Sequence, residues 1–231
     1  MILKAFRLKH PVKNRGAGLY FSMVASLFLM LFFSFPAWSK SPVDDYNAGL
    51  KHYRAGEYEQ ALPFFQEAAE HGMKEAQYHL CIMYKRGQGM ARPNAETAYS
   101  WCKKSSGQSH AAAGYEVGAS LEEGLGVEKD VAQALVHYMK ASKEGVPEAQ
   151  YALGRMYEFG LAGLARNYYQ ARMLYTWSSG KGFAPATYRV GVIYEYGKGV
   201  QPSMATARRW YAKAAAMGNE EAREKLESLG E

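Results

Sequence analysis

Five stretches of the chain repeat one pattern of hydrophobic and polar positions, and the later four carry it nearly complete at a spacing of 36 or 37 residues. In each of these, a run with apolar residues at helical spacing ends at a pair of glycines, and a second run follows after a loop. The glycine pairs are Gly87/Gly89, Gly124/Gly126, Gly160/Gly163 and Gly197/Gly199. A period of this length is typical of solenoids, in which each repeat buries its apolar faces only against its neighbours.

The third repeat illustrates how one copy builds two helices. Ala113, Val117 and Leu121 are spaced by four, so they fall on one face of a helix. Asp130 stands just before the second run, where its carboxylate can accept hydrogen bonds from the free N–H groups of the first turn. The same register holds Asn94, Asn167 and Ser203. Because the chain also lacks the alternating valine- and isoleucine-rich runs of strands, the sequence predicts an all-α fold.

The second helix of each repeat is predicted to stop at a residue that accepts positive φ. These residues are Gly72, Gly145, Gly182 and Gly218, with Ser109 in the same place in the second repeat. Small residues in the first helix let the two helices approach closely, and aromatic residues in the second fill the space toward the next repeat. The small residues are Gly118, Gly154 and Gly191, and the aromatic ones are Tyr138, Tyr175 and Tyr211.

The complete pattern, A-x-x-x-L-G-x-x-Y-x-x-G-x-G-V followed by W-Y-x-x-A-A-x-x-G, resembles the Sel1-like repeat, a relative of the tetratricopeptide repeat. It is met most fully between Ala186 and Gly218. The resemblance implies a right-handed α-solenoid of antiparallel helix pairs, with repeats at about 43–72, 73–109, 110–145, 146–182 and 183–218. The first copy has the shorter loop of an ordinary tetratricopeptide repeat, and residues 219–231 are expected to form a capping helix.

Residues 1–39 have the pattern of a secretory signal peptide. Five basic and no acidic residues accompany an apolar run from Leu19 to Phe35, and Ala37 and Ser39 are small residues where a signal peptidase reads. We predict cleavage after Ser39, which leaves residues 40–231 as the mature repeat domain. The alternative is an uncleaved anchor, because the apolar run approaches the length that spans a bilayer.

The basic character of the chain belongs to that N-terminal segment. The full sequence has 28 Lys and Arg against 22 Asp and Glu, and residues 1–39 hold five of the bases, so the mature domain has 23 bases against 22 acids, a net charge of +1. Nucleic-acid binding requires a cationic face on the folded domain. The sequence therefore gives no support for a nucleic-acid partner.

Cys81 and Cys102 are the only cysteines, and both depart from the repeat pattern. Cys81 replaces the glycine of the first helix, and Cys102 replaces the aromatic residue of the second. These positions should face each other in an antiparallel pair, and an exported chain reaches a compartment that permits disulfides. We predict a structural disulfide; the alternative is a pair of buried free thiols.

The sequence contains no motif of a hydrolase nucleophile, a phosphate-binding loop or a paired-carboxylate site. The glycine-rich loops recur in every repeat, which favours a role in turning the chain over nucleotide binding. His71 and His79 flank a predicted turn, so a chance zinc pair is the one metal alternative. We therefore predict no enzyme activity and no cofactor or metal.

A tyrosine recurs at one register of the first helix of each repeat. By resemblance to tetratricopeptide stacks, this register faces the concave groove, together with the residues four and seven positions further on. The tyrosines are Tyr46, Tyr78, Tyr115, Tyr151 and Tyr188, and the accompanying residues are Ile82 and Lys85, Ala119 and Glu122, Arg155 and Glu158, and Val192 and Glu195. We predict that this groove binds a peptide or partner helix. The alternative is that the tyrosines are repeat consensus and pack between helices.

These observations predict an exported scaffold or adaptor of the bacterial cell envelope, periplasmic or secreted, which binds a protein or peptide partner in its groove. The resemblance agrees, because Sel1-like proteins are mostly scaffolds. One alternative is a small periplasmic hydrolase of cell-wall or β-lactam substrates, by analogy with cysteine-rich Sel1-like proteins that carry a cysteine pair in nearly every repeat. Another is a scaffold tethered to the membrane by an uncleaved N-terminal segment.

Overall fold

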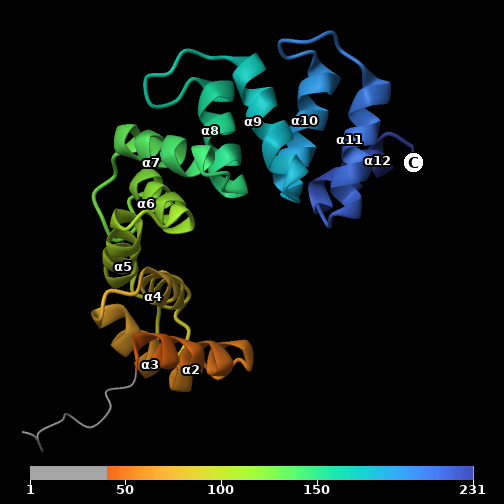
Figure 1. Cartoon of the computed structure of the whole chain (residues 1–231). Coiled ribbons are helices and arrows are strands. Elements are labelled where there is room, and N and C mark those ends of the chain that lie inside the picture. Colours follow the sequence, from red (N-terminus) through yellow and green to blue (C-terminus); the bar gives the residue numbers. More distant parts are fainter. Residues whose placement is uncertain (1–40, 231) are drawn as a thin grey trace, which may run out of the picture. The chain divides into compact units, whose positions relative to one another are not determined.

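The computed structural model describes residues 41–230, which are helical and contain no strand (Figure 1). The all-α prediction is confirmed for this part of the chain. The predicted signal peptide and cleavage site lie outside the described residues. The helices are α2 (Pro42–Arg54), α3 (Tyr58–Glu70), α4 (Lys74–Arg86), α5 (Ala95–Gly107), α6 (Ala111–Glu123), α7 (Val131–Lys143), α8 (Pro147–Phe159), α9 (Tyr168–Gly180), α10 (Ala184–Tyr196), α11 (Met204–Ala216) and α12 (Glu220–Ser228).

The helices pack as consecutive pairs, α2 with α3 through to α10 with α11, and each pair packs against the next. The last helix, α12, covers α11 as the predicted cap. The pairs follow a curved path, with α4 and α6 on the inner side and α5 and α7 on the outer side (Figure 1). The predicted solenoid is therefore present. None of the helices described is long and apolar enough to cross a bilayer.

The residues predicted to start and stop the helices do so. Each predicted cap accepts a hydrogen bond from the backbone N–H three residues later: Asn94 from Thr97, Asp130 from Gln133, Asn167 from Gln170 and Ser203 from Thr206, at 2.9 to 3.2 Å. Ser109 has a φ of 62°, as its place in a glycine position predicts. One detail differs from the sequence pattern, because Ala162 as well as Gly163 has positive φ in the loop after α8.

A glycine in the first helix and a ring in the second define the core of each complete pair. A Cβ built on Gly118, Gly154 or Gly191 would lie 2.5 to 2.8 Å from ring carbons of the paired tyrosine. These tyrosines, Tyr138, Tyr175 and Tyr211, are at most 2% exposed. The glycines are therefore needed because the rings occupy the space that a side chain would fill.

Candidate functional site

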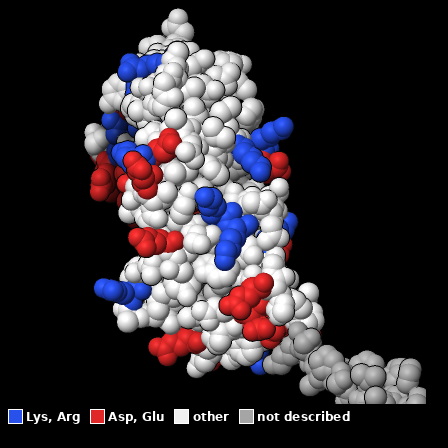
Figure 2. All heavy atoms as spheres, turned by 90° about the vertical axis from the view of Figure 1, so that its left-hand side faces the viewer, with Lys and Arg blue, Asp and Glu red and all other residues white. Residues whose placement is uncertain are grey.

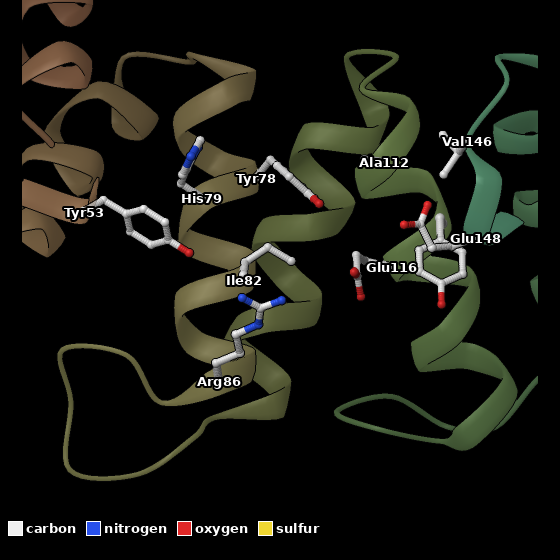
Figure 3. A pocket seen from close by; sticks show the side chains of 10 residues that line it. Tyr53, Tyr78, His79, Ile82, Arg86, Ala112, Glu116, Val146 and Glu148 are labelled. Atoms are coloured by element: carbon white, nitrogen blue, oxygen red, sulfur yellow. The ribbon is translucent and has the colours of Figure 1, made fainter. Parts of the chain in front are cut away.

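The inner side of the stack is hollowed between α2, α4, α6 and α8. This groove has a volume of about 370 Å³ and is shown in Figure 3. Aromatic and apolar side chains line it together with charges of both signs. The lining includes Tyr53 of α2, Tyr78, Ile82 and Arg86 of α4, Tyr115 and Glu116 of α6, and Glu148 of α8.

Tyr78 and Tyr115 are held in place by rings beneath them. Tyr78 stacks on His110 with ring centroids 4.5 Å apart, and Tyr115 lies tilted against buried Tyr138 at 5.8 Å. Burial, and then the nearby carboxylates led by Glu116, raise the pKa of each phenol to about 12. Both side chains therefore stay neutral at physiological pH and present a fixed ring with a hydroxyl group.

Arg86 and Glu148 lie in the same groove (Figure 3). Neither forms an ion pair with any other residue between 41 and 230. Glu116, in contrast, is paired with Lys85 at 2.6 Å between Oε2 and Nζ. The groove therefore offers one cation and one carboxylate that the fold itself does not use.

The other tyrosines of the predicted register lie outside this hollow. Tyr46 packs against Phe65, with ring centroids 5.8 Å apart, and Tyr188 packs against Tyr211 at 5.4 Å. Tyr151 contacts the rings of both Tyr175 and Phe183. All three are half-buried. Each of these tyrosines packs between helices, as the consensus alternative predicts, and each also leaves part of its ring exposed, as the groove prediction requires.

The glutamates predicted to flank the tyrosines do not face an open groove. Glu122, Glu158 and Glu195 each accept a hydrogen bond from the buried tyrosine of their own repeat. Each then pairs with a base of the next structural unit: Glu122 with Arg155 at 3.5 Å and Glu158 with Arg189 and Lys198 in the following repeat, and Glu195 with Lys225 of the capping helix α12 at 2.7 Å. We call this arrangement the tyrosine–glutamate–base tie.

Glu158 corrects the groove prediction most clearly. Its side chain is 1% exposed and is enclosed by Tyr175, Arg189 and Lys198, so it has no surface for a partner. The physical reason is position: seven residues after the tyrosine, the side chain points toward the next repeat, where a buried carboxylate needs bases. Lys85, at the same register, remains 45% exposed.

Several groove residues are not marked by the repeat register that predicts the tyrosines. Arg86 lies four residues after Ile82 and eight after Tyr78, on the same face of α4. The register four and seven residues after the tyrosine does not include it, whereas a register of four and eight does. Glu116 and Glu148 enter the groove from separate repeats, and only the curvature of the stack brings them beside Tyr78 and Tyr115. No local pattern marks them.

The structure joins Cys81 of α4 to Cys102 of α5 in the predicted disulfide, with the two Cα atoms 5.1 Å apart. Both residues are 1% exposed. The two cysteines stand at the positions where other repeats hold a glycine and a ring. The tie is also reversed here, because Lys85 replaces the glutamate and pairs with Glu116 of the following repeat.

The two histidines of the zinc alternative have other contacts. His71 Nε2 lies 3.2 Å from Glu67, and His79 Nδ1 lies 2.9 Å from the carbonyl oxygen of Glu75. His79 also stacks on Phe65 at 4.7 Å, and burial lowers its pKa. Within residues 41–230, no three potential metal ligands of the His, Cys, Asp or Glu types come together.

Charge on the outer face is mixed. The face seen in Figure 2 carries scattered groups of Lys and Arg beside groups of Asp and Glu, separated by uncharged surface. Its charges do not form a continuous basic stripe of the kind that follows a nucleic-acid backbone.

Helix pairs of this form, stacked through glycine and tyrosine contacts, define a tetratricopeptide-like α-solenoid. The family model of the Sel1 repeat matches residues 46–73, 74–110, 111–146, 147–176 and 184–219. The chain therefore belongs to the Sel1 repeat family. The first stretch, expected as a tetratricopeptide-like variant because of its short loop, also matches this model.

The proteins similar to the chain include two curated relatives. It is 31% identical over 137 residues to an exopolysaccharide production negative regulator of Rhizobium leguminosarum bv. viciae, covering 54% of this chain and 51% of the relative. It is 35% identical over 88 residues to chitin synthase regulatory factor 3 of Schizosaccharomyces pombe, covering 38% of this chain and 9% of the relative. The chain thus spans about half the length of one relative and under a tenth of the other.

The solved structures agree with the fold. A Sel1 repeat protein from Oxalobacter formigenes has a TM-score of 0.74 and 27% identity, covering 91% of this chain and 87% of that one. A protective antigen present in uropathogenic Escherichia coli strains has a TM-score of 0.69 and 29% identity, covering 82% and 41%. Sel1 repeat proteins are protein-interaction scaffolds, and the two curated relatives are regulators by name.

Proposed function

We propose that this protein is an exported scaffold of the bacterial cell envelope that holds a segment of a partner polypeptide in the groove formed by α2, α4, α6 and α8. The observation that carries the proposal is the groove itself, where the fixed rings of Tyr78 and Tyr115 lie beside the unpaired charges of Arg86 and Glu148. Rigid aromatic anchors flanked by polar groups are typical of surfaces that bind polypeptides.

Two observations support export. The N-terminal 39 residues have the charge and hydrophobic pattern of a signal peptide. The Cys81–Cys102 bond requires a compartment that permits disulfides, such as the periplasm or the exterior of the cell. We expect the N-terminus of the mature protein in periplasmic or secreted fractions to be Lys40. An intact Met1 on membrane-bound protein would instead establish the tethered form.

A non-enzymatic role is supported by the state of the residues that could act chemically. The two cysteines, whose thiols could otherwise act as nucleophiles, are bonded to each other and buried. Glu158, the most buried carboxylate described, is saturated by Tyr175, Arg189 and Lys198. These contacts favour a scaffold over the hydrolase alternative.

Site-specific photocrosslinking in the native organism tests the groove. A photoreactive phenylalanine analogue at Ile82, inside the groove, is expected to give a discrete crosslinked polypeptide. The same analogue at Val136, which is 64% exposed on the outer helix α7, serves as the control and is expected to give none. Combining the Ile82 probe with Tyr115→Ala should remove the product. Equal products from both positions would contradict the proposal.

A further inference from the structure

The junction between the second and third repeats is packed differently from those on either side. At three other junctions, a buried ring of one repeat shares a core cluster with a buried aliphatic residue of the next repeat's first helix. These pairs are Phe65 with Met83, Tyr138 with Met156, and Tyr175 with Ile193, all at most 2% exposed. At the remaining junction, the equivalent residues are Cys102 and Ser120. Both members of the pair are therefore reduced in size at one place.

The consequence is a hollow of about 220 Å³, which we call the ring socket. The Cys81–Cys102 disulfide lines it together with Ala98, Ser120 and Leu125. Leu125 is 46% exposed, so the socket reaches the surface. Mostly apolar walls suit an apolar group better than water, because they give water few hydrogen bonds.

One edge of the ring socket is polar. Lys85 and Glu116, joined at 2.6 Å, both line it. In the later repeats, the buried ring ends in a hydroxyl that donates to the glutamate of the tie, at 2.8 Å for Tyr138 and Glu122. The socket thus has an apolar slot and a carboxylate at its rim, as the sites of those tyrosines do, but the carboxylate is Glu116 of the following repeat, because Lys85 stands where the tie has its glutamate, and no ring fills the slot.

We propose that the ring socket receives a tyrosine side chain from the partner polypeptide, which completes the second repeat as Tyr138 and Tyr175 complete theirs. The inference rests on the proposed function for the source of the tyrosine. Glu116 lines both the groove and the socket, so a segment lying in the groove passes beside the socket rim. An aromatic ring matches the slot, and its hydroxyl matches Glu116 in hydrogen-bonding character.

The socket is tested without any partner by using p-cresol, the analogue of the tyrosine side chain, with the oxidised mature protein. Saturable shifts of the Leu125 methyl signals in NMR are expected on titration. Ser120→Met places in the socket the residue that Met156 provides in the next junction, and should weaken p-cresol binding at least tenfold. Ser120→Ala leaves the space open and is the matched control, with binding unchanged.

A second variant controls for the possibility that Ser120→Met reduces binding by disturbing the packing around the socket. Cys81→Gly with Cys102→Tyr restores the glycine and ring of the other repeats, so its own ring should occupy the socket and abolish p-cresol binding. Circular dichroism establishes that each variant folds. Absence of saturable binding to the wild type, or equal binding to Ser120→Met, would overturn the inference. So would equal binding of 4-methylcyclohexanol, which has no aromatic ring.

The two proposals fail in different ways. If p-cresol does not bind but Ile82 still crosslinks a polypeptide, the socket is refuted and the scaffold stands. If p-cresol binds but Ile82 crosslinks nothing, the scaffold assignment fails and, with it, the partner as the source of the ring. With both results positive, replacing tyrosines of the crosslinked segment by alanine should reduce its affinity in wild type and leave its affinity for Ser120→Met unchanged.

Discussion

At the scale of single residues, the fold depends on glycines in the first helix of a pair, which leave room for a tyrosine ring of the second helix. Gly154 in α8 leaves the space that the Tyr175 ring of α9 fills, and the same match recurs in the repeats on either side. Where the second repeat loses the ring it also loses the glycine, and Cys81 and Cys102 take both places. A cysteine at the glycine position requires the loss of the ring, because its Cβ would overlap the ring that the other repeats hold there.

We therefore expect Gly154→Ala to destabilise the protein. The added Cβ would lie 2.6 Å from the Tyr175 ring, and such overpacking costs about 1–3 kcal/mol of unfolding free energy. Gly180→Ala is the matched control, because no atom lies within 4 Å of its Cβ position. This second change should leave stability equal or raise it by about 0.5–1 kcal/mol. Urea denaturation measures both, and similar losses from the two variants would refute the ring-contact explanation.

At the scale of elements, the tyrosine–glutamate–base tie joins each helix pair to the next. Glu158 of α8 is bound by Tyr175 of α9 and by Arg189 of α10, so one carboxylate connects three helices. Burial is the largest single influence on this carboxylate and raises its pKa. The hydrogen bonds and charges of Arg189, Lys198 and Tyr175 together outweigh burial, and the pKa of Glu158 lies below its ordinary value of 4.5.

This lowered pKa sets a direction for pH dependence. Because native Glu158 binds a proton less readily than unfolded Glu158, its contribution is complete above pH 4.5 and is lost as pH falls through the lower native pKa. Glu158→Gln should therefore lower the unfolding free energy near pH 7 by on the order of 3 kcal/mol. Its difference from wild type should shrink as the pH falls below 4.5.

Glu220→Gln provides the control for the tie. Glu220 pairs with Arg223 at the surface, with 68% of its side chain exposed, so its loss should cost about 0–1 kcal/mol. Thermal and urea unfolding across pH 3 to 8 compare the variants. A Glu158→Gln difference that stays constant with pH would show that packing, and not charge, explains the effect.

At the scale of the whole described domain, the repeats form a chain in which each pair contacts mainly its neighbours. The unfolding free energy is then roughly the sum of the stabilities of the single repeats and of the contacts between neighbouring repeats. A change in one repeat therefore first affects that repeat and its neighbours. The disulfide links positions 21 residues apart within the second repeat. Closing a loop of this length contributes on the order of 3 kcal/mol.

Removing the disulfide should therefore loosen one end of the stack before the other. Cys81→Ala with Cys102→Ala is expected to lose hydrogen-exchange protection first in α4 and α5, while α10 and α11 keep theirs. Reductant should lower the hydrogen-exchange protection of α4 and α5 in the wild type and leave the protection of the double variant unchanged. Uniform loss across all helices would contradict a repeat-by-repeat distribution of stability.

Local patterns predicted much of this architecture. Asp130 and Asn167 cap helices because a side-chain oxygen next to free N–H groups acts within four residues of chain. The disulfide could be predicted for a related reason, because comparison of the repeats places both cysteines at facing positions of one helix pair. The groove was predicted only in part: Tyr78, Ile82 and Tyr115 line it, but Glu158 does not. A helical period gives the angle of a side chain around its own helix, and leaves open which neighbour it meets.

By itself, the sequence determined the helices, their ends, their pairing into repeats and the link between Cys81 and Cys102, because these follow from contacts within one repeat and from comparison of its copies. Only the tertiary structure decided which charges the stack uses internally and which it leaves in the groove. It also decided that Cys102 and Ser120 together leave the ring socket. These features arise between repeats, where the packing and curvature of successive pairs bring together residues that no local spacing relates.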